Sequence, residues 1–244
     1  MNNPLQQWFN NLYDEFGDDV PKPEDYLKVI EAVTSSMNAT PGKYLGSGDN
    51  GIAFLASDGD IIKFTIDQNE ALLWHRLKSK QQPGITHLKD VANIASSKTG
   101  SSIIYVLKAE FAPNPVADNQ AKLIRIGVKN ASEQTQEDLR KMGVKRDKDL
   151  YIARRTVNLV KQFQKIADEN HEFEQIPNLL MDLADKHGGH IYDLQPDNFR
   201  RKLNGEVVLV DPSVPDLVGE IQHPRDILYE DRLELALITR KIFY

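Results

Sequence analysis

Cysteine is absent from this chain of 244 residues. Its absence excludes disulfide bonds, zinc sites built on thiolates, iron–sulfur clusters and cysteine nucleophiles. The fold must therefore be stable through packing alone.

Long apolar runs are also absent. No window approaches the roughly 18 consecutive apolar residues that indicate a membrane-spanning helix. The first residues, Met1-Asn2-Asn3-Pro4-Leu5, lack the basic and apolar regions of a signal peptide. We therefore expect a soluble, cytoplasmic protein that makes no contact with a membrane.

An excess of positive charge is lacking as well, because 30 Lys and Arg residues face 36 Asp and Glu residues, for a formal net charge of −6. Such a surface repels nucleic acid unless a basic patch reverses the sign locally. The basic residues at 141–148 are interleaved with Asp147 and Asp149, so we expect no nucleic-acid partner. Apolar residues make up 40% of the chain, enough to bury the core of one or two domains.

Two stripes of apolar residues at helical spacing occupy the region 4–38, and Pro21-Lys22-Pro23 separates them. We interpret the two helices as an N-terminal layer packed on the main body. The alternative is a regulatory or partner-binding extension. The stripes consist of Leu5, Trp8, Phe9, Leu12 and Phe16, followed by Tyr26, Val29, Ile30 and Val33.

Between 43 and 111 the period changes to short apolar runs typical of strands. Asp58-Gly59 lies between two of these runs, where a tight hairpin turn is expected. One helical pattern at 70–78 interrupts them, so we predict a small antiparallel sheet with one helix. The predicted strands are 44–45, 52–56, 61–66, 91–94 and 103–107.

After Pro113 and Pro115 the pattern is mostly helical. A hairpin is predicted from the turn dipeptide Asn204-Gly205, which joins strands at 199–203 and 207–210. The charged stretch 129–148 is interpreted as a solvated face or loop, with a partner surface as the alternative. The predicted helices are 134–141, 148–170, 176–187 and 227–242.

A glycine-rich string, Gly46-Ser47-Gly48-Asp49-Asn50-Gly51, lies between two predicted strands. A dinucleotide fingerprint would require a helix after it, whereas 52–56 is predicted to be a strand. A glycine loop between strands is typical of a flap over nucleotide phosphates, because backbone N–H groups can then approach the phosphate oxygens. An ordinary hairpin loop is the alternative.

Lys63 ends an apolar run on the next predicted strand, and Glu70 opens the helix that follows. An apolar strand that ends in lysine resembles the phosphate-pairing lysine strand of protein kinases, in which a helix glutamate is the partner of the lysine. This resemblance implies an ion pair between Lys63 and Glu70. For Glu70 there is a second interpretation, since Asp67 and Glu70 have the spacing of a helix capping box.

Three oxygen-bearing residues are placed to converge near the predicted hairpin. Asp193 and Asn198 are five residues apart, and Asp211 ends the second strand of the hairpin. Asp193 has the chemistry to accept a hydroxyl proton, while Asn198 and Asp211 offer oxygen ligands to Mg²⁺. A polar loop beside a capped hairpin is the alternative.

Together these motifs resemble those of the protein-kinase-like superfamily, over roughly 43–212. The resemblance implies an α+β, bilobal protein-kinase-like fold that binds ATP and Mg²⁺. It implies a small antiparallel β-sheet lobe at 41–112 and a reduced, mainly helical lobe at 113–244, and the two predicted helices then form an N-terminal helical extension at 1–40. The matching residues are Gly46, Gly48 and Gly51 of the glycine loop, the strand lysine Lys63, the D-L-x-x-x-N catalytic loop from Asp193 to Asn198, and the metal-binding Asp211.

The resemblance also assigns roles to residues around ATP. The segment 105–112 corresponds to the hinge, where the backbone of Glu110 and Ala112 would contact adenine. The glycine loop, including Ser47, would cover the phosphates, and Glu70 would hold Lys63. Asp193, Lys63 and Asn198 would be the catalytic residues, with Asn198 and Asp211 as the metal ligands.

The departures from the superfamily pattern are specific. Ile191 and Tyr192 replace the usual histidine and arginine before the catalytic Asp, and Gln195 replaces a lysine that contacts phosphate. Pro212-Ser213 replaces the Phe-Gly that normally follows the metal-binding Asp, and no A-P-E motif follows. The usual platform for a peptide substrate is therefore absent or rebuilt.

We therefore expect an ATP- and Mg²⁺-dependent phosphotransferase that modifies a protein Ser/Thr hydroxyl. Pro196-Asp197-Asn198 is more similar to the protein-kinase loop than to the P-G-N loop of aminoglycoside and choline kinases. The short helical lobe resembles kinase-like proteins of bacteria and their phages, which would place a phage protein in the host cytoplasm. The alternatives are a small-molecule kinase of the aminoglycoside phosphotransferase type and a nucleotide-binding pseudokinase that acts through a partner.

Overall fold

The computed structural model divides the chain into two compact units. The first unit comprises Met1–Lys80, His87–Phe111 and Glu220–Tyr244, and the second comprises Gln81–Thr86 and Ala112–Gly219. The structure describes residues 3–78, 82–95, 103–144, 148–187, 194–211 and 225–228. The α+β class predicted from the sequence is confirmed.

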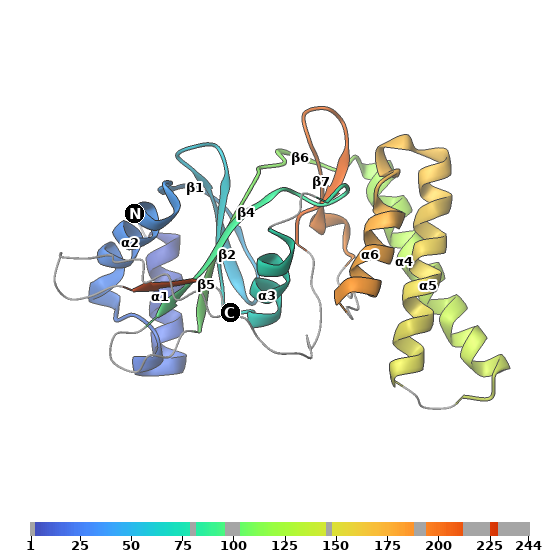
Figure 1. The fold of residues 1–244 in the computed structure, drawn as a ribbon, viewed down its shortest axis with the longest axis horizontal. Coiled ribbons are helices and arrows are strands. Elements are labelled where there is room, and N and C mark those ends of the chain that lie inside the picture. The colour runs from blue at the N-terminus through green and yellow to red at the C-terminus, as the bar shows by residue number, and fades with distance from the viewer. Residues whose placement is uncertain are drawn as a thin grey trace. The chain divides into compact units, whose positions relative to one another are not determined.

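The first unit contains a six-stranded sheet in the order β1-β2-β3-β5-β4-β9 (Figure 1). Neighbouring strands are antiparallel except for β4 and β9, which pair in parallel. The β2–β3 hairpin turns at Asp58-Gly59 as predicted, and Gly59 takes a left-handed φ of 86° there. The strands are β1 (Pro41–Ser47), β2 (Gly51–Ala56), β3 (Ile61–Thr65), β4 (Leu88–Ala95), β5 (Ile104–Ala109) and β9 (Arg225–Leu228).

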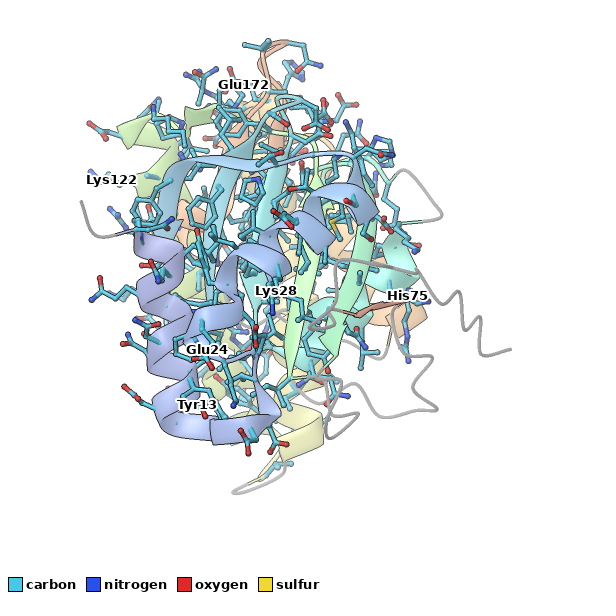
Figure 2. All side chains as sticks on the ribbon, turned by 90° about the vertical axis from the view of Figure 1, so that its left-hand side faces the viewer. Tyr13, Glu24, Lys28, His75, Lys122 and Glu172 are labelled. Carbon is cyan, nitrogen blue, oxygen red and sulfur yellow. The ribbon has the colours of Figure 1, made fainter. Side chains whose placement is uncertain are left out.

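Helices cover both faces of this sheet. The predicted N-terminal layer is confirmed: α1 (Pro4–Phe16) and α2 (Tyr26–Met37) lie over one face, as Figure 2 shows from their side. Helix α3 (Gln68–Leu77) packs on the opposite face. Because successive residues of a strand point to opposite faces, β3 contacts both layers. Phe64 packs on Phe9 of α1 with ring centroids 6.0 Å apart, whereas its neighbour Lys63 contacts α3.

In its described residues, the second unit contains three α-helices, the short helices η3 (His171–Phe173) and η4 (Pro196–Asn198), and a small sheet (Figure 1). Helices α4 (Asp118–Lys141) and α5 (Lys148–Glu169) run side by side, and α6 (Ile176–His187) packs on α5. The sheet has the order β6-β7-β8, and its predicted hairpin turns at Asn204-Gly205. Its strands are β6 (Asn114–Pro115), β7 (Phe199–Arg201) and β8 (Val207–Leu209).

Helix α4 is longer than the sequence pattern predicted, since it starts at Asp118 and the prediction began at 134. Much of the stretch interpreted as a solvated face or loop is therefore the second half of this helix. The buried stripe of α4 contains Gly127 and Thr135, which are not apolar and so interrupted the expected period. A Cβ at Gly127 would lie 3.0 Å from Ile166 Cδ1, so the glycine permits α5 to approach.

The predicted C-terminal helix at 227–242 is wrong where the structure describes it. Ile227 and Leu228 lie in β9, which pairs with β4 residues up to Ala95. Pairing with a distant strand overrides the local helical period. The rest of the predicted helix lies outside the described residues.

Two findings bear on the predicted boundaries and on membranes. The stretch His87–Phe111 of the first unit ends at Phe111, next to the predicted boundary between 112 and 113. Residues 82–86 belong to the second unit although the chain before and after them belongs to the first, and β9 belongs to the first unit although it follows the second in the sequence. Among the helices in the described part of the chain, none has both the length and the apolar character needed to cross a bilayer.

Candidate functional site

The predicted contact between Lys63 and Glu70 forms in the first unit. Lys63 Nζ lies 2.7 Å from Glu70 Oε1, and the two side chains are 19% and 4% exposed. The capping interpretation is confirmed in part, because Asp67 accepts hydrogen bonds from the N–H groups of Asn69 and Glu70. Asp67 therefore fixes the start of α3, and α3 in turn directs Glu70 at the lysine of β3.

Burying this ion pair costs free energy, because at least one of its charges is removed from water. Glu70 is one of the buried charged residues of the first unit, and removing a carboxylate from water costs several kcal/mol. Apolar residues of similar volume at both positions would be about as stable. The pair is thus weakly justified by stability, which makes it a candidate for function.

The glycine string forms the predicted loop between two strands. Gly48 N–H donates to Gly51 C=O, and Asn50 C=O accepts from Ile66 N–H at 2.8 Å, which fastens the loop to the end of β3. A Cβ at Gly51 would lie 2.6 Å from Phe64 O and 3.3 Å from Lys63 Cε. Only glycine at this position lets β2 lie this close to the backbone of β3, and its missing side chain leaves room beside the lysine.

The other predicted loop residues are not held in this way. A Cβ at Gly46 or Gly48 would meet no atom within 4 Å, so packing does not explain why these positions are glycine. Ser47 Oγ lies 3.0 Å from Tyr44 Oη. The loop therefore combines one glycine fixed by packing with two that face open space.

Of the predicted hinge residues, Glu110 directly follows β5, and its N–H donates to His87 C=O at 2.9 Å. This amide is engaged within the first unit. Ala112 is buried and is the first residue of the longer stretch of the second unit.

The sequence reasoning missed a charged network on the other face of the sheet. Lys108 is only 8% exposed, and its Nζ donates to Met37 C=O at the end of α2. It also lies 2.5 Å from Asp58 Oδ2 and 3.7 Å from Asp60 Oδ2, while Lys89 contacts Asp60 at 2.5 Å. A lysine inside the apolar run of β5 was the signal that could have revealed this network.

The charge of Lys108 affects the titration of its partner. Burial raises the pKa of Asp58, but the hydrogen bond from Lys108, the backbone N–H of Asp60 and the charge of Lys108 together leave this pKa below its usual value. Asp58 is therefore held in its ionised form.

In the second unit, the backbone brings two predicted metal ligands together. Asn198 ends the short helix η4 (Pro196–Asn198), and its C=O accepts a hydrogen bond from Val210 N–H at 2.8 Å. Asp211 is the next residue, and both Asn198 and Asp211 are half-buried. Asp193, the predicted base, lies outside the described residues, as do Pro212 and Ser213.

The chemistry of Asn198 and Asp211 fits Mg²⁺, which takes oxygen ligands and commonly has only one or two from protein. Within the described residues no group of three or more His, Asp or Glu is arranged to hold a metal. Water and phosphate oxygens would have to complete the coordination, as is usual for Mg²⁺ bound with a nucleotide.

A further polar feature of the second unit was not predicted. Asn158 of α5 is 3% exposed, and its Nδ2 donates to Thr135 Oγ1 at 3.1 Å and to Asp138 Oδ2 at 3.3 Å. A cavity of about 370 Å³ beside it is lined by polar side chains of α4 and α5 and includes none of the predicted site residues.

Comparison of the sequence with models of known protein families gives no match, and comparison with curated proteins gives none either. Any assignment of function therefore depends on the residues and their geometry.

Proposed function

We propose that this chain is an ATP- and Mg²⁺-dependent phosphotransferase of protein-kinase-like fold, and that its acceptor is a protein Ser/Thr hydroxyl. Phosphoryl transfer depends mainly on positioning and on neutralising phosphate charge. Lys63 would contact the phosphates, and Asn198 and Asp211 would hold the metal ion. Asp193 would accept the proton of the attacking hydroxyl group.

The observation that carries the proposal is the Lys63–Glu70 ion pair at 2.7 Å, with Gly51 packed against the lysine side chain. The pair fixes the ammonium group of Lys63 beside a loop in which Gly46 and Gly48 have open space around them. A cation beside a glycine loop that has room for a ligand over its missing side chains is suited to an anionic group such as a phosphate chain.

The second unit adds independent support. Asn198 and Asp211 were predicted as a pair, and the hydrogen bond between Asn198 and Val210 brings their backbones side by side. When bound, Mg²⁺ would supply positive charge to the phosphate oxygens. Gln195 is exposed and carries no charge, so Lys63 and the metal would have to supply that neutralisation.

Thermal unfolding with and without Mg-ATP tests nucleotide binding. A ligand that binds only the folded state at a hundredfold excess over Kd adds about 2.7 kcal/mol of stability. We expect this gain in the wild type, a large loss of it in Lys63→Met, and loss of its Mg²⁺-dependent part in Asp211→Ala. Lys89→Met is the matched control, since Lys89 also pairs with an acid in this sheet but on the other face. A wild-type melting temperature unmoved by Mg-ATP would overturn the proposal.

Mass spectrometry after incubation with Mg-ATP tests transfer. A mass gain of one phosphate on a protein substrate, or on the chain itself, is expected for the wild type. Asp193→Asn should bind nucleotide normally but transfer about 10²–10⁴ times more slowly, because a general base is removed. Phosphate found only on small alcohols would favour the small-molecule kinase. Nucleotide binding without any transfer would favour the pseudokinase.

A further inference from the structure

The segment 82–86 connects two elements of the first unit in sequence, α3 and β4, but it belongs to the second unit. There it lies parallel to the end of β8, with Ile85 opposite Leu209. Leu209 N–H donates to Gly84 C=O at 2.8 Å, and Thr86 N–H donates to Leu209 C=O at 3.1 Å. Gly84, Ile85 and Thr86 are all buried. The segment thus forms a single parallel bridge to the end of β8.

The position of this pairing matters because Leu209 precedes Asp211 by two residues. Leu209 is fully buried, and both of its backbone polar groups are used by the segment. On its other side Leu209 faces Phe199, and Val210 bonds to Asn198. The two residues before Asp211 are therefore hydrogen-bonded to two different segments: Val210 to Asn198, and Leu209 to the 82–86 segment.

Gly84 is required for this arrangement. Its φ of 78° lies in the left-handed region, which side chains strongly disfavour. A Cβ on Gly84 would also lie 3.0 Å from Gln175 O and 3.1 Å from Gln175 C, which is tighter than most Cβ contacts with backbone atoms. Any other residue would strain the backbone at this φ and would push the segment and Gln175 apart by a few tenths of an ångström.

We propose that the 82–86 segment positions Asp211 for metal binding, with Gly84 as the positioning residue. The inference rests on the proposed function, because it assigns a role to a metal ligand of that site. If the segment moved, the buried N–H and C=O of Leu209 would lose their partners, and the end of β8 would shift to recover hydrogen bonds. A carboxylate must be held within about 0.5 Å of its productive position to bind metal well, so Asp211 would be misplaced.

The test separates metal-dependent from metal-independent nucleotide binding. Binding of a non-hydrolysable ATP analogue is measured by calorimetry with MgCl₂ and again with EDTA. We expect Gly84→Ala to bind the metal-free analogue like the wild type but to lose about 10–100-fold of the affinity gained with Mg²⁺, the usual effect of disturbing a ligand's support. Destabilisation of the fold alone would lower the affinity for the analogue both with MgCl₂ and with EDTA.

Gly143→Ala is the matched control. Gly143 has a similar left-handed φ of 71° in the same unit, but a Cβ there meets no atom within 4 Å. It introduces backbone strain without displacing β8, so both affinities should equal those of the wild type. A folded Gly84→Ala protein that keeps the full Mg²⁺ gain would overturn the positioning role while leaving the proposed function intact. A wild type with no Mg²⁺ gain would overturn both.

A second pair of variants covers the case in which Gly84→Ala does not fold. Thr86→Pro removes the N–H that donates to Leu209 and leaves the Gln175 contact unchanged, while Thr86→Val keeps this N–H and removes the hydroxyl group. We expect the Mg²⁺ gain to fall in Thr86→Pro relative to Thr86→Val. Equal gains in these two proteins would count against the proposal.

Discussion

The two units differ in the polar groups that they bury. The first unit buries charged side chains on both faces of its sheet, among them Glu70 beside Lys63 on one face and Lys108 with Asp60 on the other. In the second unit the buried polar residues within the described ranges are all neutral: Thr86, Gln120, Thr135 and Asn158. The first unit should therefore be sensitive to the loss of one charge and to pH, whereas the second should lose only hydrogen bonds.

The largest effect is expected for the Lys63–Glu70 pair. Glu70→Leu should cost about 3 kcal/mol of unfolding free energy, because breaking a buried ion pair leaves its other charge poorly compensated. The double variant Lys63→Met/Glu70→Leu should recover most of this loss, since an apolar pair of similar volume is about as stable. Urea unfolding measures both.

The same double variant separates structure from function. Its unfolding free energy should return close to that of the wild type, but the addition of Mg-ATP should not raise its melting temperature. A double variant that Mg-ATP still stabilises like the wild type would make the pair merely structural. One as unstable as Glu70→Leu would show that the two residues act independently in the fold.

A smaller effect is expected on the opposite face of the sheet. Lys108→Met removes a buried cation from Asp58 and from Met37 C=O, which should cost about 2 kcal/mol because Asp58 is still partly solvated and Asp60 keeps Lys89. Lys89→Met, whose side chain is 40% exposed, should cost less than about 1 kcal/mol. Chemical denaturation of the two variants compares them, and equal losses would contradict the role of burial.

In the second unit the corresponding change should be milder. Asn158→Leu removes hydrogen bonds to Thr135 and Asp138 but no charge, and Thr135 keeps its bond to Ala131 C=O at 2.7 Å. We expect a loss of about 1 kcal/mol in urea unfolding. A loss larger than that of Lys108→Met would break the distinction between the two units.

The smallest effect concerns pH and His75 of α3. Burial lowers the pKa of His75 below its ordinary value of 6.5, and Lys78 and Arg76 lower it further against the opposing charge of Asp90. As the pH falls below 6.5 the unfolded chain takes up a proton before the folded protein does, so stability decreases. His75→Gln should reduce the difference in melting temperature between pH 7.5 and pH 5.5. An unchanged difference would exclude His75 as its source.

The sequence predicted those features that depend on residues close together in the chain. The apolar stripes of α1 and α2, the turn at Asp58-Gly59 and the turn at Asn204-Gly205 each depend on residues within a few positions of one another. The Lys63–Glu70 contact also belongs here, because a strand and the helix that directly follows it leave few alternatives for the pair.

Features that depend on distant segments were not predictable in this way. β9 is a strand because it lies beside β4, and Lys108 is buried because its charge meets the end of α2. The pairing of Ile85 with Leu209 leaves no periodic signal in either segment. In α4 the small residue Gly127 packs as an apolar residue would, which conceals the first half of the helix from a period search.

The exchange of segments between the units has a consequence for synthesis on the ribosome. β4 lacks its neighbour β9 until residues 225–228 have been translated, after nearly all of the second unit. The 82–86 segment likewise leaves the ribosome long before its partner β8. Domains usually fold one after another as they emerge, but here neither unit can complete its backbone pairing before most of the other has been made. During that interval the nascent chain exposes an unpaired edge of β4 on which another chain could pair.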